Sequence, residues 1–513
     1  MIPAAAVLVR RLAAWGAGTV FGYPGGQLTP IYDALADAGL RHVLARHEQA
    51  AAFMADGWAR ATGKVGVCLA VCGPGLYNAA TALAAAHSDS VPVLCLSGQV
   101  PTRGAGLRSG YYHENEQAEA ARHFCKAVFR ATEPARLPET LDRAWLAAIA
   151  GRPGPVLLEV PVDVLRTRVE PREPPLPAVP SPVGAWNSSL IASWERPLVL
   201  AGGGAIGAED ALAAVAERLG APVFHTSNGK CVLPGHHPLN AGMPWMRATS
   251  DLSDMKDLLS PLFAQADGLL AVGCRFTQLA TASWTLEPPP VIQLDIDPAE
   301  IGRHYPAHGV IGDARAALEA LLPHLPPRQP WAAIPEPPAW TLPGIDAVPA
   351  IQRALPADAI VSADVTRLAY MLMARLRLAG RRSWLHPAGS VAMGYGLPAA
   401  LGAKAAHPSR PVLCVVGDGG LQMSAMELAT AAQERLPVVV LLVNDSCLTL
   451  IKATQERHYP GRAVAVDLRN PDFGKLAEAF GVRAWRCSDE AGLERSLREA
   501  FATGETALVE LVL

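Results

Sequence analysis

Residues 411–446 decide the fold, and they read PVLCVVGDGGLQMSAMELATAAQERLPVVVLLVNDS. The apolar run Pro411 to Val416 is typical of a strand buried in a parallel sheet. Ser424-Ala-Met-Glu427 fits a capping box, which predicts a helix that runs to about Arg435. A second apolar run, Pro437 to Val443, predicts the next strand. Such a strand-helix-strand crossover returns the chain in parallel.

Acidic side chains follow both predicted strands. Asp418 comes just after the first strand, and Asn444-Asp445 come directly after the second. Because the carboxyl ends of parallel strands meet at one edge of a sheet, we expect these side chains to converge there. Carboxylates suit a hard cation such as Mg²⁺, while Gly417, Gly419 and Gly420 let a ligand approach the backbone amides. The block therefore predicts a diphosphate bound together with its metal.

The same block resembles the thiamine diphosphate signature, in which Gly-Asp-Gly is followed by an Asn pair after a helix and a strand. The separation 445 − 418 = 27 matches the spacing usual in that family. Asp445 stands in place of the second Asn, and a carboxylate binds Mg²⁺ at least as well as an amide oxygen. The resemblance implies that Asp418, Asp445 and the backbone carbonyl of Cys447 are the metal ligands. The alternative is a doubly wound sheet in which Gly-Asp-Gly only makes a tight turn.

Length and composition indicate a multidomain protein and give no sign of nucleic-acid or membrane binding. The chain has 513 residues, enough for about three domains, and its net charge is only −3. No polybasic stretch and no apolar run of membrane-spanning length occurs in the sequence. The nine cysteines show no zinc-ligand spacing, so reduced thiols and a cytoplasmic location are expected.

Two proline-rich stretches divide the sequence into three parts. Residues 166–187 and 325–344 cannot form regular helices or central strands, so we interpret both as linkers. The three remaining segments, 1–165, 188–324 and 345–513, each alternate apolar strand-like runs with Ala-rich helical stretches. This pattern predicts an α/β protein with three doubly wound parallel-sheet domains.

The middle segment contains a glycine motif with two interpretations. Gly202 to Gly207 formally satisfies GxGxxG after a strand, but no acid stands about 20 residues later, which favours a structural turn. The segments 273–276 and 295–301 resemble the central domain of acetohydroxyacid synthases, some of which carry FAD. Thr277-Gln278 stand where the FAD-binding members have an acidic pair, so the sequence does not support bound FAD.

In the first segment, Glu48 opens a predicted helix that runs to about Ala61. A Glu in the first helical turn is favourable simply through the helix dipole. The surrounding motifs, however, resemble the pyrimidine-binding domain of the thiamine diphosphate family: His47-Glu-Gln-Ala-Ala51, Gly57-Trp-Ala-Arg-Ala-Thr-Gly63, Cys72-Gly-Pro-Gly75 and Ser90-Val-Pro92. That resemblance implies that Glu48 holds N1′ of the aminopyrimidine, and that Gly73 and Asn78 contact the cofactor. A partly buried carboxyl group can share a proton with a ring nitrogen near neutral pH.

The third segment supplies the complementary part of the predicted cofactor site. In Gly389-Ser-Val-Ala-Met-Gly-Tyr-Gly396, the resemblance places Ser390 at the cofactor and Met393 as the apolar wedge beneath it. Leu448 follows the metal loop, where relatives place cofactor and substrate contacts. In this family the Glu-bearing domain of one subunit faces the diphosphate domain of another. The resemblance therefore implies a homodimer or a homotetramer.

The stretch around His113 bears on whether the reaction is a decarboxylation or a carboligation. Overall the chain is most similar to the acetohydroxyacid synthase branch, but His113 falls where pyruvate decarboxylase-like enzymes have the second His of a pair. A His beside a carboxylate, here Glu114, is a competent proton relay, whereas a polar turn is the plainer interpretation. We therefore expect decarboxylation of a 2-oxo acid through an enamine to an aldehyde. Carboligation onto a second 2-oxo acid is the alternative. A dinucleotide-dependent oxidoreductase would leave Glu48, Asp418 and Asp445 unexplained, and a cofactor-binding relative without turnover would have little reason to retain Glu48.

Overall fold

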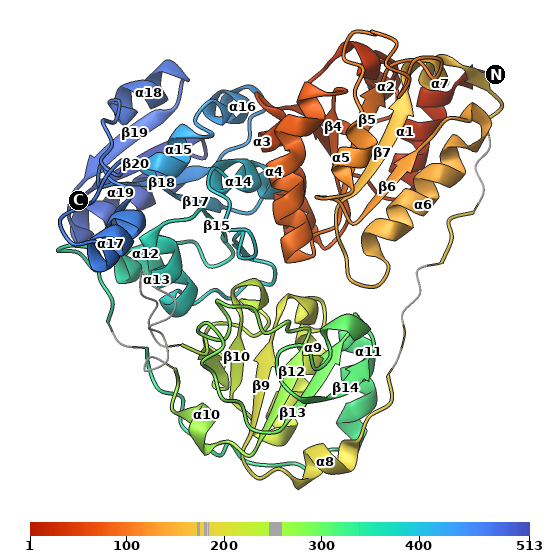
Figure 1. The fold of residues 1–513 in the computed structure, drawn as a ribbon. Coiled ribbons are helices and arrows are strands. Elements are labelled where there is room, and N and C mark those ends of the chain that lie inside the picture. The colour runs from red at the N-terminus through yellow and green to blue at the C-terminus, as the bar shows by residue number, and fades with distance from the viewer. Residues whose placement is uncertain (172–174, 179–181, 183, 246–258, 338) are drawn as a thin grey trace.

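The computed structural model describes residues 1–171, 175–178, 182, 184–245, 259–337 and 339–513. Figure 1 shows three α/β domains, with the N-terminal and C-terminal domains side by side and the central domain below both. Each domain contains a six-stranded parallel sheet, which confirms the predicted fold class. Parts of the two predicted linkers, residues 172–174, 179–181, 183 and 338, lie outside the described residues.

The first sheet has the strand order β3-β2-β4-β5-β7-β6. Its four inner strands are buried because helices cover both faces of the sheet, whereas the edge strands β3 and β6 are partly exposed. A short antiparallel pair joins β1 (Ile2–Pro3) to β8 (Arg168–Val169) beside it. The remaining strands are β2 (Thr19–Gly22), β3 (Arg41–Leu44), β4 (Gly66–Ala70), β5 (Val93–Gln99), β6 (Ala127–Arg130) and β7 (Val156–Pro161). The helices are α1 (Ala4–Ala14), α2 (Thr29–Ala36), α3 (Glu48–Thr62), α4 (Pro74–Asp89), α5 (Gln117–Ala121), α6 (Leu137–Ile149) and α7 (Val162–Arg166).

The central sheet has the order β11-β10-β9-β12-β13-β14. The glycine run after β9 packs directly on another loop: a Cβ atom at Gly202 would lie 2.0 Å from the carbonyl oxygen of Gly273. This close approach accounts for the glycine motif without a bound dinucleotide. The strands are β9 (Pro197–Ala201), β10 (Val223–His225), β11 (Asn240–Gly242), β12 (Gly268–Val272), β13 (Val291–Asp295) and β14 (Ala307–Ile311). The helices are α8 (Ser188–Ser193), α9 (Glu209–Leu219), α10 (Leu262–Gln265) and α11 (Ala314–Leu321).

The third sheet has the order β16-β15-β17-β18-β20-β19. The strands β17 and β18 run in parallel, with Gly417 opposite Val443, as residues 411–446 predict. The strands are β15 (Ile360–Ala363), β16 (Trp384–Leu385), β17 (Val412–Gly417), β18 (Val439–Asn444), β19 (Arg483–Cys487) and β20 (Ala507–Val512). The helices are α12 (Ala347–Ala354), α13 (Arg367–Arg375), α14 (Gly396–Ala406), α15 (Asp418–Gln422), α16 (Glu427–Gln433), α17 (Thr449–His458), α18 (Phe473–Ala479) and α19 (Glu490–Ala502).

The predicted capping box at Ser424 and Glu427 is wrong. The helix α16 begins only at Glu427, and the buried Ser424 hydroxyl has no hydrogen-bond partner among the described residues. The Glu427 carboxylate instead accepts the backbone N–H of Arg46 at 2.9 Å, from the N-terminal domain. A contact between domains has therefore replaced the local cap.

None of the described helices has the length and apolar character needed to cross a membrane.

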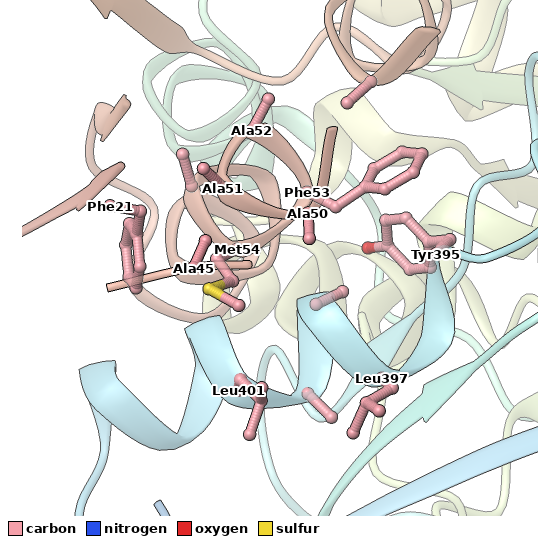
Figure 2. Close-up of a cluster of buried hydrophobic side chains, with 14 of the residues drawn as sticks. Phe21, Ala45, Ala50, Ala51, Ala52, Phe53, Met54, Tyr395, Leu397 and Leu401 are labelled. Carbon is pink, nitrogen blue, oxygen red and sulfur yellow. The ribbon is translucent and has the colours of Figure 1, made fainter. Parts of the chain in front are cut away.

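The N-terminal and C-terminal domains share one hydrophobic core. Figure 2 shows α3 crossing α14, with the Phe53 ring beside the Tyr395 ring. These rings meet edge to face, with their centroids 5.3 Å apart. Since Glu48 is the first residue of α3, this crossing sets where Glu48 lies relative to the C-terminal domain.

Candidate active site

Asp418 and Asn444 meet at the carboxyl edge of the third sheet, as predicted from the crossover. Asp418 is nearly fully buried, and its Oδ1 accepts the backbone N–H of Gly419 at 2.8 Å. The Asn470 amide donates both to Asp418 Oδ2 at 2.6 Å and to Asn444 Oδ1 at 2.9 Å. Asn470 thus fixes the two polar side chains that end β17 and β18.

Asp445 and Cys447 lie in the loop that leaves β18. The Thr449 hydroxyl donates to Asp445 Oδ2, and Cys447 forms an isolated antiparallel bridge with Asp467. The loop is held further by Leu448 N–H, which donates to the carbonyl of Val466 at 2.7 Å. These contacts hold in place the carboxylate and the backbone carbonyl that we predict to bind metal.

The electrostatics around Asp418 favour a cation. Burial and the negative charge of Asp445 raise the pKa of Asp418, whereas hydrogen bonds from Asn470 and backbone amides lower it. A divalent cation bound beside Asp418 would offset both its burial and the repulsion from the nearby negative charge of Asp445.

Two sequence-predicted cofactor residues, Met393 and Leu448, lie beside a third, Gly419. A Cβ atom at Gly419 would lie 2.9 Å from the Leu448 side chain and 3.4 Å from the Met393 methyl group. Met393 precedes α14 and Leu448 precedes α17, so the fold brings together three separate segments of the sequence. Glycine keeps this space open beside an apolar wall.

Asp364, which the sequence analysis did not identify, organises the Met393 loop. Its carboxylate is fully buried and accepts the backbone N–H groups of Val365 at 2.7 Å, Gly394 at 3.3 Å and Gly396 at 2.8 Å. A Cβ atom at Gly420 would lie 3.2 Å from this carboxyl group. Burial raises the pKa of Asp364 to about 6, although the backbone donors lower it. Asp364 therefore links the Met393 loop to the glycine turn after β17.

Glu48 begins α3, where His47 caps the helix by accepting the N–H of Gln49 at 3.1 Å. The Asn78 amide donates to Glu48 Oε2 at 2.9 Å, so two predicted cofactor residues contact each other. The Tyr32 hydroxyl is buried without a hydrogen-bond partner among the described residues, and burial followed by the charge of Glu48 raises its pKa. The Glu48 region thus holds an unpartnered polar group.

Gly73 and Ser390 occupy positions of different kinds. Gly73 precedes α4 with φ of 71°, and its N–H donates to the Gln117 side chain at 3.0 Å. The Ser390 hydroxyl donates to the Ser88 hydroxyl at 2.7 Å, across the contact between the C-terminal and N-terminal domains. Gly73 lies at the end of β4 near the His113 loop, whereas Ser390 lies at a domain boundary.

His113 lies on a loop that a buried polar network supports. The Cys72 thiol donates to the His113 carbonyl at 2.8 Å, and the Gln99 amide donates to the Asn115 carbonyl at 3.0 Å. The imidazole stacks on Tyr112, and its buried Nδ1 has no hydrogen-bond partner within the described ranges. The loop backbone is therefore held by hydrogen bonds, while the imidazole is placed by stacking and its Nδ1 is left without a partner among the described residues.

Hydrogen bonds to the backbone, rather than a contact with His113, account for the position of Glu114. Its carboxylate accepts the backbone N–H groups of Ser109 at 3.1 Å and Tyr111 at 3.3 Å. Glu114 thus closes the loop in which His113 lies.

Comparison with known proteins matches each of the three domains. A model of the thiamine pyrophosphate enzyme N-terminal TPP binding domain matches residues 2–122, and the central-domain model matches residues 188–321. The C-terminal TPP binding domain matches residues 364–511, which include the Asp418 edge. The chain belongs to the thiamine pyrophosphate enzyme family. It is an enzyme whose cofactor is thiamine diphosphate, another name for thiamine pyrophosphate.

Relatives within this family include both decarboxylases and synthases. A probable 2-ketoarginine decarboxylase of Pseudomonas aeruginosa is 39% identical, over 99% of this chain and 94% of the relative. A probable acetolactate synthase large subunit of Methanocaldococcus jannaschii is 35% identical, over 99% of this chain and 91% of the relative. The acetolactate synthase isozyme 3 large subunit of Escherichia coli is 35% identical, over 98% of this chain and 92% of the relative.

The residues present fit thiamine diphosphate and its metal. The paired carboxylates, the open glycine turn beside Leu448 and Met393, and the unpartnered Tyr32 hydroxyl near Glu48 each suit one part of that cofactor. Sequence reasoning missed Asn470 and Asp364. Asn470 carries no motif that could have revealed it, whereas Asp364 follows the apolar strand β15 and could have been found by the same edge rule as Asp418.

Proposed function

We propose that this enzyme catalyses the Mg²⁺-dependent, non-oxidative decarboxylation of a 2-oxo acid and releases an aldehyde. The observation that carries the proposal is His113, whose buried Nδ1 is unpartnered within the described ranges on a loop held by Cys72 and Gln99. A proton donor in this position favours protonation of the substrate carbon over its transfer to a second substrate. The 39% identical decarboxylase supports the same outcome.

The chain's own residues divide the work in three parts. Asp418, Asp445 and the Cys447 carbonyl would hold Mg²⁺ against the diphosphate, while the amides of the glycine turn after β17 would contact the phosphate oxygens. Met393 and Leu448 would pack against the apolar part of the cofactor. When bound, thiamine diphosphate supplies a carbon nucleophile and an electron sink for loss of carbon dioxide.

Glu48 and His113 would carry out the two proton transfers of the reaction. The Glu48 carboxyl group would hold a proton at N1′ of the aminopyrimidine, and Asn78 keeps the carboxylate directed by its 2.9 Å hydrogen bond. His113 Nδ1 would deliver a proton to the carbon that has lost carbon dioxide. Glu114 would act on this step only by holding the His113 loop.

The functional test is a product assay. The purified protein with thiamine diphosphate and Mg²⁺ is incubated with a panel of 2-oxo acids that includes pyruvate and 2-ketoarginine, and both aldehyde and acyloin products are measured. We expect aldehyde as the main product, and His113→Ala to lower its formation by about 10²- to 10⁴-fold. Glu114→Gln is the matched control and should retain most activity. Acetolactate as the main product with pyruvate would transfer the assignment to carboligation, which the acetolactate synthase relatives favour.

We further propose that the active unit is a homodimer or homotetramer in the cytoplasm, with Glu48 of one subunit facing Asp418 of another. Large apolar side chains are exposed on both halves of the site, and a second copy would cover them: Tyr77, Tyr112, Val391, Met423 and Met426. The nine free cysteines suit a reducing compartment.

Complementation tests this arrangement. Glu48→Gln and Asp418→Asn chains are each expected to be inactive, but when co-produced in equal amounts they should recover about one quarter of wild-type activity. Half of the random dimers are then hybrids, and each hybrid has one intact site of two. A site formed within a single chain would show no recovery.

A further inference from the structure

Glu427 is a buried carboxylate that the proposed chemistry does not use. It is fully buried at the start of α16, nine residues after Asp418. Its Oε1 and Oε2 accept the backbone N–H of Arg46 at 2.9 and 3.2 Å, and Oε2 accepts the Thr430 hydroxyl at 2.7 Å. Arg46 stands two residues before Glu48. A side chain of the diphosphate domain therefore binds the turn that presents Glu48.

The surrounding contacts show that this turn lies against α16 along its length. Thr430 also donates to the Leu44 carbonyl at 3.1 Å, and Leu44 N–H donates to Glu434 Oε1 at 3.3 Å. The Arg46 guanidinium donates to Gln433 Oε1 at 2.7 Å. The end of β3 is thus attached to α16 by several hydrogen bonds, and the Glu427 contact lies next to His47, the cap of α3.

Burying the Glu427 carboxylate costs free energy unless hydrogen bonds compensate for the lost water. Burial raises the pKa of Glu427 to about 7, while hydrogen bonds from Thr430 and from the Arg46 and His47 backbone lower it. Apart from the Thr430 hydroxyl in its own helix, the hydrogen-bond donors to Glu427 are backbone N–H groups of the Arg46–His47 turn. That turn sets where α3 begins and hence where Glu48 lies.

We propose that Glu427 is a positioning residue that fixes Glu48 through the backbone of the Arg46–His47 turn. The inference rests on the proposed role of Glu48. In the proposed dimer, Glu48 would serve a site completed by the partner, whereas Glu427 follows the Asp418 glycine turn of its own chain. The hydrogen bond thus joins the two half-sites that one chain contributes to different active sites.

Three substitutions separate reach from charge. Glu427→Gln keeps the length and one acceptor, Glu427→Asp keeps the charge but is one methylene too short, and Glu427→Ala removes both acceptors. We expect kcat to fall about 10- to 100-fold in the Ala and Asp variants, as for a misplaced catalytic group, and to stay within about 5-fold of wild type in the Gln variant. KM for the 2-oxo acid and Kd for thiamine diphosphate should change less than about 3-fold.

Glu434→Ala is the matched control, because Glu434 also binds the end of β3 but through Leu44, farther from Glu48. We expect its kcat to stay within about 2-fold of wild type. The proposal is overturned if Glu427→Asp equals or exceeds Glu427→Gln in kcat, or if Glu427→Ala and Glu434→Ala lower kcat equally. The Gln and Asp comparison remains informative if the Ala variant fails to fold.

A double-mutant cycle distinguishes failure of this inference from failure of the proposed function. If Glu427 acts through Glu48, adding Glu427→Asp to Glu48→Gln should lower the residual kcat less than 2-fold further. A full additional loss in the double variant would refute the positioning role. Wild-type activity in Glu48→Gln alone would instead refute the proposed role of Glu48.

Discussion

The crossing of α3 and α14 offers a stringent test of how the active-site domains are held together. At this crossing, two glycines bring the helix backbones into direct contact. A Cβ atom at Gly402 would lie 1.9 Å from the carbonyl oxygen of Met54, and one at Gly57 would lie 2.2 Å from that of Ala399. Ordinary contact begins near 3.4 Å, so Gly402→Ala requires the backbones to separate by about 1.5 Å.

The size of the effect follows from two opposing terms. Overpacking costs about 1–3 kcal/mol, and a helix carbonyl cannot rotate away as a side chain could, so we take the upper end of that range. Alanine stabilises a helix interior over glycine by about 1 kcal/mol. The free energy of unfolding should therefore fall by about 2 kcal/mol. With an unfolding entropy of about 2.1 cal/mol/K per residue, this lowers Tm by about 2 °C if the chain unfolds as one unit.

Thermal and urea unfolding of Gly402→Ala and of a control measure this effect. In the control Gly474→Ala, the new Cβ would lie 3.3 Å from Oδ1 of Asp472, the N-cap of α18, which is only about 0.1 Å short of ordinary contact, so α18 should be stabilised by up to about 1 kcal/mol. Adding Gly57→Ala to Gly402→Ala should cost less than the sum, because the first substitution already separates the helices. A Gly402→Ala protein as stable as wild type would refute the close backbone contact.

Three further predictions concern buried polar groups. Arg60→Met should lower the free energy of unfolding by about 3–5 kcal/mol in urea titrations, since it leaves two buried carboxylates, Asp56 and Asp89, without their cation. Asn470→Ala should raise the Mg²⁺ concentration for half-maximal activity about 10-fold after EDTA treatment, because Asn470 orients Asp418. The raised pKa of Asp364, about 6, means that folding binds its proton more tightly. That stability is present below about pH 3.8 and is lost as pH rises through 6, so wild type should lose up to about 3 kcal/mol more than Asp364→Asn between pH 4 and 7.

Each of these predictions has a result that would contradict it. For the Arg60 network, the comparison is Arg353→Met, which breaks a more exposed pair with Glu494 and should cost at most about 1 kcal/mol; equal losses would show that burial is irrelevant. For the metal site, an unchanged Mg²⁺ requirement in Asn470→Ala would remove Asn470 from the site. For Asp364, a stability difference from the Asn variant that stays constant with pH would show that the carboxyl group does not titrate in this range.

Much of the site follows from local pattern together with one topological rule. Apolar runs of strand length on either side of a helical stretch place Asp418 and Asn444 at one sheet edge, and the structure shows both bound by the same amide of Asn470. Glu48 likewise begins a helix, as expected because the sequence pattern changes from strand-like to helix-like after β3. These features depend on residues close in sequence, so periodicity and spacing are sufficient to predict them.

The residues that hold the site in place could not be found in this way. Glu427 matched a local capping box, yet its carboxylate binds Arg46, 381 residues away in sequence. The Asp364 carboxylate accepts backbone N–H groups about 30 residues later in the sequence. Gly57 and Gly402 are needed only because the two helices that contain them cross in close contact. A buried polar group takes whichever partner the packed chain brings within hydrogen-bond distance. The sequence alone determined the strands, helices and sheet edges of this protein, because those depend on near neighbours. Only the tertiary structure decided which distant groups fix the side chains that we predict to be catalytic, because a buried polar group needs a hydrogen-bond partner.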